Sequence, residues 1–114
     1  MPRKLLVTSS LALLLLCSAA WAQSSSDSQV RSLQGQVVND AEAPLAQAIV
    51  YLKNTKTLAV KSYITQKDGM YHFNALSSNV DYEIHAEFQG KKSGTKTLSS
   101  FDSRRNPTIN LKIK

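Results

Sequence analysis

Apolar and polar residues alternate with a period of two along several short segments of this chain, most regularly in Tyr82–Phe88. One face of that segment carries Tyr82, Ile84, Ala86 and Phe88, and the other carries Glu83, His85 and Glu87. Alternation of this kind predicts a β-strand with one buried and one wet face. From Val30 onward no stretch keeps helical spacing over three turns, so we predict an all-β fold.

Further strands are predicted on either side of this segment, separated by turn-rich breaks. The predicted strands are 33–38, 48–53, 58–65, 70–74, a weaker one in 92–98, and a final one in which Ile109, Leu111 and Ile113 face inward. The inward direction of 58–65 stays open, because Val60 and Ile64 point one way while Ala59 and Tyr63 point the other. Seven short strands with one apolar face each are buried economically by two antiparallel sheets packed face to face.

Residues 1–22 have the features of a cleavable signal peptide. Arg3 and Lys4 precede an apolar run, and Ala20-Trp21-Ala22 supplies the small-x-small pattern before the expected cut. The apolar run is shorter than the ~20 residues that span a bilayer. We therefore expect an exported protein, periplasmic or secreted, with no membrane segment after cleavage, a flexible serine-rich leader at 23–29 and one domain at 30–114.

Removing the signal peptide also removes functional options. Cys17 is the only cysteine and Trp21 the only tryptophan, so the mature chain is predicted to lack disulfides, thiolate nucleophiles and cysteine-bound metals. Its net charge is +4, with twelve basic residues against eight acidic ones. The basic excess lies from Lys91 onward.

This basic third offers a candidate surface for an anionic partner. Its members are Lys91, Lys92, Lys96, Arg104 and Arg105. An exported protein is not expected to bind nucleic acid, which leaves lipid head groups, acidic polysaccharide or an acidic protein surface. The alternative is a solvated face that only aids solubility.

Four groups of residues occur in an order that resembles the carboxypeptidase regulatory-like domain. They are Gly35-x-Val37, Pro44-Leu45-x-x-Ala48-x-Val50-x-Leu52, Thr65-x-x-Asp68-Gly69-x-Tyr71-x-Phe73-x-x-Leu76 and Tyr82-x-Ile84-x-Ala86. The resemblance implies a transthyretin-like (prealbumin-like), seven-stranded antiparallel Greek-key β-sandwich without catalysis of its own. The chain departs from the family at Ala43 and Gln47, where glycine is usual.

The sequence gives no support to an enzyme, a cofactor or a metal centre. A zinc peptidase would need Glu three residues after a ligand His, but Ala75 follows His72 and Phe88 follows His85 at that spacing. The two histidines could share a surface metal with a carboxylate if their strands paired. We predict instead that both are solvated.

We therefore predict a non-catalytic module that acts by recognition or as a structural element of the cell envelope, with a protein or envelope component as its partner. The alternative is a small carbohydrate-binding (starch-binding-like) domain, in which Tyr51 and Tyr63 would form an outward aromatic platform for a sugar. Cross-strand packing of the two tyrosines is the competing explanation. An exposed edge strand could recruit a peptide or a second copy, and the oligomeric state stays open.

Overall fold

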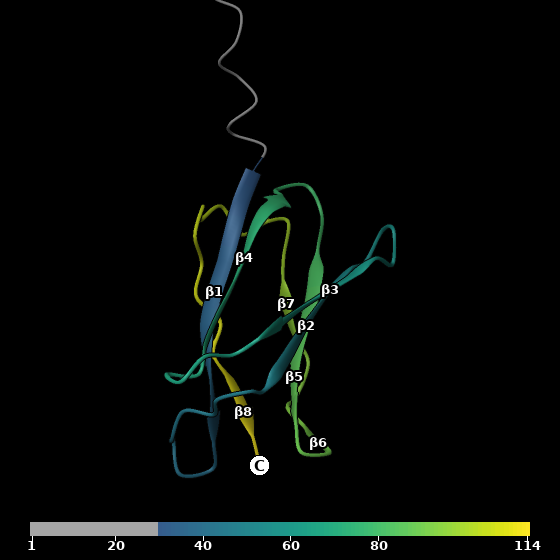
Figure 1. Cartoon of the computed structure of the whole chain (residues 1–114). Coiled ribbons are helices and arrows are strands. Elements are labelled where there is room, and N and C mark those ends of the chain that lie inside the picture. The colour runs from purple at the N-terminus through teal and green to yellow at the C-terminus, as the bar shows by residue number, and fades with distance from the viewer. Residues whose placement is uncertain (1–29) are drawn as a thin grey trace, which may run out of the picture.

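The structure, a computed structural model of the chain, describes residues 30–114 (Figure 1). The predicted signal peptide and leader lie outside the described residues. The described part contains no helix, and therefore none long and apolar enough to cross a membrane. Its eight strands are β1 (Val30–Asn39), β2 (Ile49–Asn54), β3 (Val60–Ile64), β4 (Met70–Ser77), β5 (Tyr82–Phe88), β6 (Lys91–Lys92), β7 (Lys96–Leu98) and β8 (Leu111–Ile113).

Two sheets form a sandwich, as predicted. The smaller sheet has the order β4-β1-β8, and the larger has the order β3-β2-β5-β6 with β7 also paired to β5. The strand count is eight rather than seven because the segment predicted as one strand at 92–98 divides into β6 and β7. Ser93 causes the division: its N–H donates to the Ala86 carbonyl and its hydroxyl accepts from the Ala86 N–H, which replaces a regular ladder.

One strand pair is parallel, which corrects the prediction of a fully antiparallel fold. β8 runs parallel to β1, with Val37 opposite Leu111 and Asn39 opposite Ile113. The reason is the connection after β7, which passes over the end of the sandwich where β1 begins and where Ser32 N–H donates to the Arg105 carbonyl. The chain therefore enters the smaller sheet in the same direction as β1.

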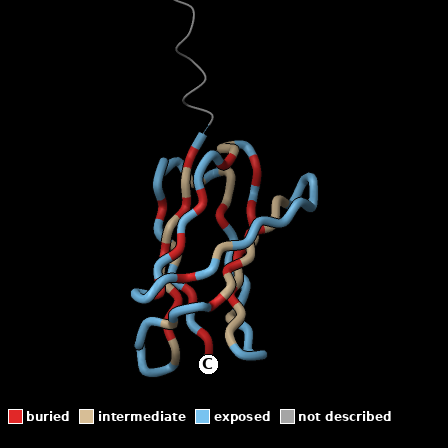
Figure 2. The backbone as a smooth tube through the Cα atoms, viewed as in Figure 1, coloured by how far each residue is buried: buried red, intermediate tan, exposed pale blue. Residues whose placement is uncertain are grey.

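The core lies between the sheets and follows the predicted parity (Figure 2). Inward-facing side chains from both sheets are almost fully buried: Leu33, Val37, Val50, Leu52, Tyr71, Phe73, Ile84, Ala86, Leu111 and Ile113. The alternate residues of β8 are exposed, as expected. Burial of this set is the main favourable contribution to folding, and residues 30–114 contain no cysteine that could add a disulfide.

Two glycines hold the first strand against its neighbours. Gly69 has φ +73°, a left-handed conformation that glycine adopts without steric cost, and Asp68 Oδ1 accepts the Met70 N–H at 3.0 Å. At Gly35 a Cβ would lie 1.8 Å from the Ile109 carbonyl oxygen. That oxygen accepts a 2.6 Å hydrogen bond from the Tyr71 hydroxyl, and burial raises the pKa of the Tyr71 phenol. Only glycine leaves room for this crossing.

A bulge interrupts β4 opposite β1. The register shifts between Arg31, which pairs with Leu76, and Leu33, which pairs with Phe73. Ala75 lies in the extra segment with φ +59°. A bulge adds one residue to one strand and so reverses the parity of the residues after it. Tyr71, Phe73 and Leu76 consequently all reach the core.

Candidate functional site: the edge of β3

β3 is one edge of the larger sheet and, within the described chain, pairs only with β2. The Asn54 N–H donates to the Ala59 carbonyl and the Thr65 N–H to the Ala48 carbonyl, so these odd-numbered residues turn their backbone groups toward β2. In an antiparallel ladder the direction alternates along the strand. The backbone N–H and C=O groups of Val60, Ser62 and Ile64 therefore point away from β2, and no strand of the described chain pairs with them.

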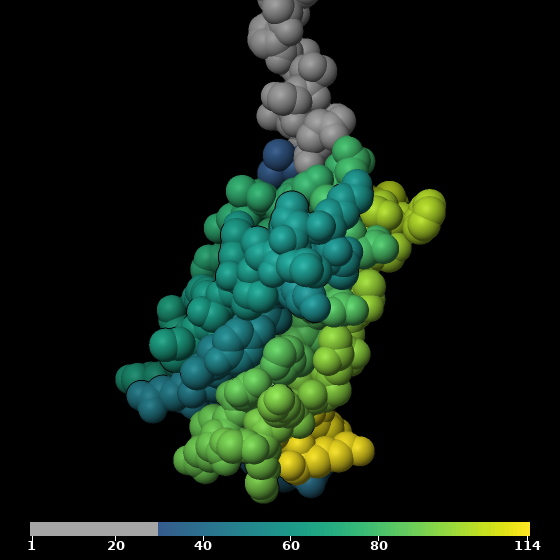
Figure 3. Space-filling view, turned by 90° about the vertical axis from the view of Figure 1, so that its right-hand side faces the viewer, coloured from purple at the N-terminus to yellow at the C-terminus, as the bar shows by residue number. Residues whose placement is uncertain are grey.

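Apolar side chains accompany these backbone groups. Val60 is 56% exposed and Ile64 62% exposed, both on the outer face of the sheet, and Leu58 is 63% exposed in the turn before β3. The tip of the β2–β3 hairpin projects beyond the sandwich in Figure 1, and the hairpin, drawn in teal, crosses the face turned to the viewer in Figure 3. We call the side chains of Leu58, Val60, Ser62 and Ile64, together with the outward backbone groups of the last three, the β3 edge.

The β3 edge is also basic. Lys53, Lys56, Lys61 and Lys67 lie on or beside the hairpin, and residues 53–67 contain no Asp or Glu. None of the four lysines forms a salt bridge with a residue of the described part. The surface therefore combines unpaired strand backbone, exposed aliphatic side chains and the positive charge of Lys61. Glu83 on β5 lies opposite Lys53, and the charge of Lys56 contributes to the lowered pKa of Asp81.

The predicted tyrosine platform does not form, because the two rings lie on opposite faces of the larger sheet. Tyr63 pairs with the buried Val50, so it faces the core side, where its ring contacts Phe73 at 6.1 Å between centroids. The prediction of outward parity for Tyr63 was wrong. The apolar Val60 and Ile64 take the outward positions because β3 must place Thr65 inside: its hydroxyl donates to the Leu45 carbonyl.

Tyr51 does face outward, as predicted, and lines an open groove of about 440 Å³ on the larger sheet. Its ring stacks on that of His85, with centroids 5.2 Å apart. His85 Nε2 lies 3.2 Å from Glu87 Oε2, and Lys53 and Glu83 also line the groove. One aromatic ring and several polar groups thus share this groove.

The two histidines lie in different sheets. His72 is on β4 and His85 on β5, so the pairing that a shared metal would require is not present. His72 instead packs against the Tyr63 ring at 5.0 Å. Among residues 30–114 there is no cluster of three His, Cys, Asp or Glu side chains suited to hold a metal ion.

The predicted basic patch is divided between the two ends of the sandwich. Arg104 and Arg105 line a pocket with Val30, where β1 starts, whereas Lys91 lines a pocket with Asn39, where β1 ends. A ten-residue strand separates those ends by about 30 Å. The five basic residues therefore form no single surface, because β6 and the segment after β7 extend to opposite ends.

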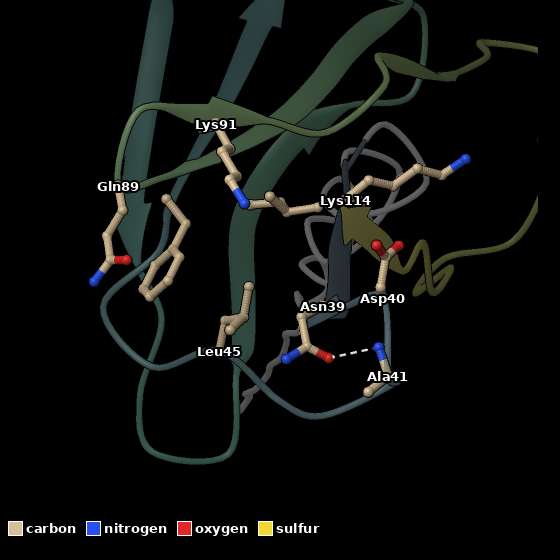
Figure 4. A pocket seen from close by; sticks show the side chains of 9 residues that line it. Asn39, Asp40, Ala41, Leu45, Gln89, Lys91 and Lys114 are labelled. Carbon is tan, nitrogen blue, oxygen red and sulfur yellow. Dashed lines mark hydrogen bonds between the residues drawn. The ribbon is translucent and has the colours of Figure 1, made fainter.

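Several of these cations already have partners. Arg104 donates to the Asp102 carboxylate at 2.6 Å, and this bond lowers the pKa of Asp102 to about 2. The Lys96 ammonium donates to the Asn110 carbonyl, and Lys92 lies 3.9 Å from Glu87. Lys91 lies with Lys114 on one side of an end pocket of about 340 Å³, with Leu45 on the other side (Figure 4).

Arg31 is a buried residue that the sequence analysis did not single out. It is 4% exposed, and its guanidinium donates to the carbonyls of Ser77, Val80, Ser99 and Asp102. It thereby fixes the segment that presents Phe101, which is 94% exposed. The inward parity of Arg31 with Leu33 was the available signal, but a charged residue at a strand start is usually assigned to solvent.

A family model for the carboxypeptidase regulatory-like domain matches residues 32–114. The chain belongs to this family. The match extends the resemblance seen in the motifs through β8. The family is one of regulatory-like domains rather than of catalytic ones. No curated protein sequence matches the chain.

Solved structures similar to this regulatory-like domain include several dioxygenases. A chlorocatechol 1,2-dioxygenase from Pseudomonas putida has a TM-score of 0.58 at 10% identity, covering 80% of this chain and 62% of that one. The dioxygenase domain of a dioxygenase carbohydrate-binding protein fusion from a Streptomyces species has a TM-score of 0.55 at 16% sequence identity. This match covers 80% of this chain and 83% of that one. A catechol 1,2-dioxygenase from an Acinetobacter species has 0.55 at 11%, covering 81% of this chain but only 54% of its own length.

These likenesses show the shared sandwich fold alone, because the identities are so low. The chain spans little more than half the length of the first dioxygenase structures it matches. Their chemistry is therefore not assigned to this domain.

Proposed function

We propose that this regulatory-like domain is an exported, non-catalytic recognition module that binds a protein partner of the cell envelope, periplasmic or secreted, through the β3 edge. The observation that supports it is the unpaired outer side of β3, which carries exposed Val60 and Ile64. Natural sheets usually shield such an edge from other chains, and an extended segment that pairs with it gains main-chain hydrogen bonds.

The other sheet edges of the described chain are less suited to this role. β8, at the other edge of the smaller sheet, has three residues. β6 and β7 have two and three residues and are separated by the break at Ser93. β4 is longer, but the bulge at Ala75 disturbs its ladder. β3 is thus the uninterrupted edge that also exposes aliphatic side chains.

Crosslinking in cells tests this proposal. A photoreactive phenylalanine analogue in place of Ile64 should give a discrete protein adduct in the exported fraction. The same analogue in place of Thr108, on the smaller sheet, is the matched control and should give none. Equal adducts from both positions, or none from Ile64, would contradict recognition at the β3 edge.

The groove around Tyr51 favours a second candidate function, the binding of a carbohydrate. The partly buried Tyr51 ring, beside Glu83, His85 and Lys53, offers one stacking surface with several hydrogen-bonding groups around it. Sedimentation with insoluble polysaccharides checks it: binding should fall at least tenfold in Tyr51→Ala and persist in Tyr63→Phe. Retention of the domain on none of the polysaccharides would remove this candidate.

A further inference from the structure

We propose that the β3 edge accepts an extended acidic segment, in which apolar and acidic residues alternate, as an added strand beside β3. This inference rests on the proposed function, since it names the chemistry of the partner at the same edge. It follows from three properties of that edge: the direction of its backbone groups, the parity of its side chains and its charge.

The backbone determines the register of an added strand. Val60, Ser62 and Ile64 offer three N–H donors and three C=O acceptors that point away from β2. An added strand must therefore place hydrogen-bonded residues opposite these three positions. Five partner residues are enough to reach from Val60 to Ile64.

The side chains then specify what alternates along the partner. Residues opposite Val60, Ser62 and Ile64 lie on the outer face, where the two aliphatic side chains are more than half exposed. Directly opposed side chains in a sheet are about 4.5 to 5.5 Å apart, close enough for apolar contact. Apolar partner residues at these positions would cover Val60 and Ile64.

The remaining partner residues lie on the inner side, opposite Lys61 and Tyr63. Lys61 borders a cleft of about 260 Å³ at the open edge between the sheets, with Ala59, Ala75 and Ser77. A glutamate opposite Lys61 would compensate its charge within this cleft. Lys61 forms no salt bridge within the described part of the chain, and residues 53–67 contain no acidic residue.

The same charge argues against a second copy of the chain as the occupant. Two antiparallel β3 strands paired about Ser62 would place Lys61 of each copy diagonally across from the other, about 7 to 8 Å apart. Like charges opposed in this way are destabilising, and lysine on an edge strand discourages self-pairing. An acidic segment turns this repulsion into attraction.

A synthetic peptide tests the inference directly. The probe is fluorescently labelled Ser-Val-Glu-Val-Glu-Val-Ser, and the control probe carries lysine in place of both glutamates. Titrated with the protein as the cell makes it, the acidic probe should bind saturably and at least tenfold more tightly than the basic one by fluorescence anisotropy. Its affinity should fall as salt rises.

Two pairs of variants locate the binding. Lys61→Glu should weaken the acidic probe at least tenfold and strengthen the basic one, whereas Lys114→Glu, the same charge change at the far end of the sandwich, should alter neither. Ser62→Pro removes an outward N–H that β2 does not use and should abolish binding. Ser62→Thr keeps that N–H and should bind normally, and the melting temperatures of all four variants establish that they fold.

The outcomes separate the inference from the proposed function. Equal binding of both probes, or binding that Lys61→Glu leaves unchanged, would overturn the inference that the added strand is acidic. A concentration-dependent dimer that Ser62→Pro abolishes would show a second copy to be the occupant, and would also overturn it. An Ile64 adduct in cells, combined with either result, would leave recognition at the β3 edge intact.

Discussion

Individual residues in this domain hold backbone conformations that usually belong to glycine. Glu42, Gln47, Leu58, Ala75 and Gln89 all have φ between +48° and +66°. The departures from the family noted in the sequence, at Ala43 and Gln47, fall on or beside two of them. The structure shows that Glu42 and Gln47 adopt the left-handed conformation without being glycine, and a side chain in this region costs about 1 to 2 kcal/mol.

Gln47→Gly should therefore stabilise the domain. We expect a gain of about 0.5 to 1 kcal/mol, because glycine adopts φ +63° without steric cost while losing some backbone entropy on folding. Urea unfolding measures it. Gln66→Gly, at a position without positive φ, is the control and should be neutral or destabilising; a similar gain from both changes would show that strain at Gln47 is not the cause.

The pattern of residues along β1 does not determine the hydrogen-bond partners of Arg31. Its place on the inward side of β1 could be read from parity, but the four carbonyls that receive its guanidinium come from segments 46 to 71 residues away. Those carbonyls converge only when both sheets are assembled. The same limit applies to Tyr63, whose direction depends on where Thr65 is anchored.

Among the strands, β4 shows most clearly how an irregular sequence pattern corresponds to an irregular strand. The spacing Tyr71-x-Phe73-x-x-Leu76 breaks the period of two, and the bulge at Ala75 is the structural reason. The predicted strand ended at residue 74 because regular alternation does not continue past it, whereas β4 continues to Ser77 through the bulge. By contrast β5 was predicted with its correct bounds, since its alternation is uninterrupted and each inward residue meets the core.

Phe73→Ala should cost about 3 to 5 kcal/mol of unfolding free energy, as expected for a large buried aromatic residue. Phe73 is 6% exposed and packs against the rings of Tyr63 and Tyr71. Thermal and urea unfolding provide the measurement. Phe101→Ala removes an equal ring from an exposed position and should change stability by less than about 0.5 kcal/mol. Equal effects of the two changes would place Phe73 outside the core.

Low pH should reduce the stability of the domain, because two carboxylates hold the segment after β7 in place. Bonds from Arg104 lower the pKa of Asp102 to about 2, and a hydrogen bond from the Ser100 N–H lowers the pKa of Asp81. A carboxyl with a folded pKa below its unfolded value of about 3.9 stabilises the fold above that pH, and this contribution disappears as the pH falls toward the folded value.

Asp102→Asn should therefore be less stable than the wild type at pH 7, and the difference should shrink toward zero as the pH falls through 2. Melting temperatures across this range measure the difference, and most of the change should fall between pH 4 and pH 2. A difference that stays constant with pH would show that the Asp102 carboxylate contributes nothing as a charge.

At this scale the sequence predicted the sandwich and its core but not the direction of β8. Strand parity specifies which face is buried, and it contains no information on whether a neighbour runs parallel or antiparallel. That direction follows from the crossing of the segment after β7 over the Arg31 end of the fold. The family match and the two sheets agree with the predicted sandwich, apart from the division of the segment 92–98 into β6 and β7.

The parallel pairing of β1 with β8 also affects the order in which the domain can fold when its N-terminal end emerges first. Gln36 donates to the Asn110 side chain, 74 residues later. Until that distant segment has emerged, one flank of β1, including the side of Gly35 that the Ile109 carbonyl covers, stays open to solvent. Pairing two segments so far apart in the sequence is slow. The unpaired edge of β1 can bind other unfolded segments until β8 has formed. A regulatory-like domain of this topology would benefit from a holding chaperone more than its modest size suggests.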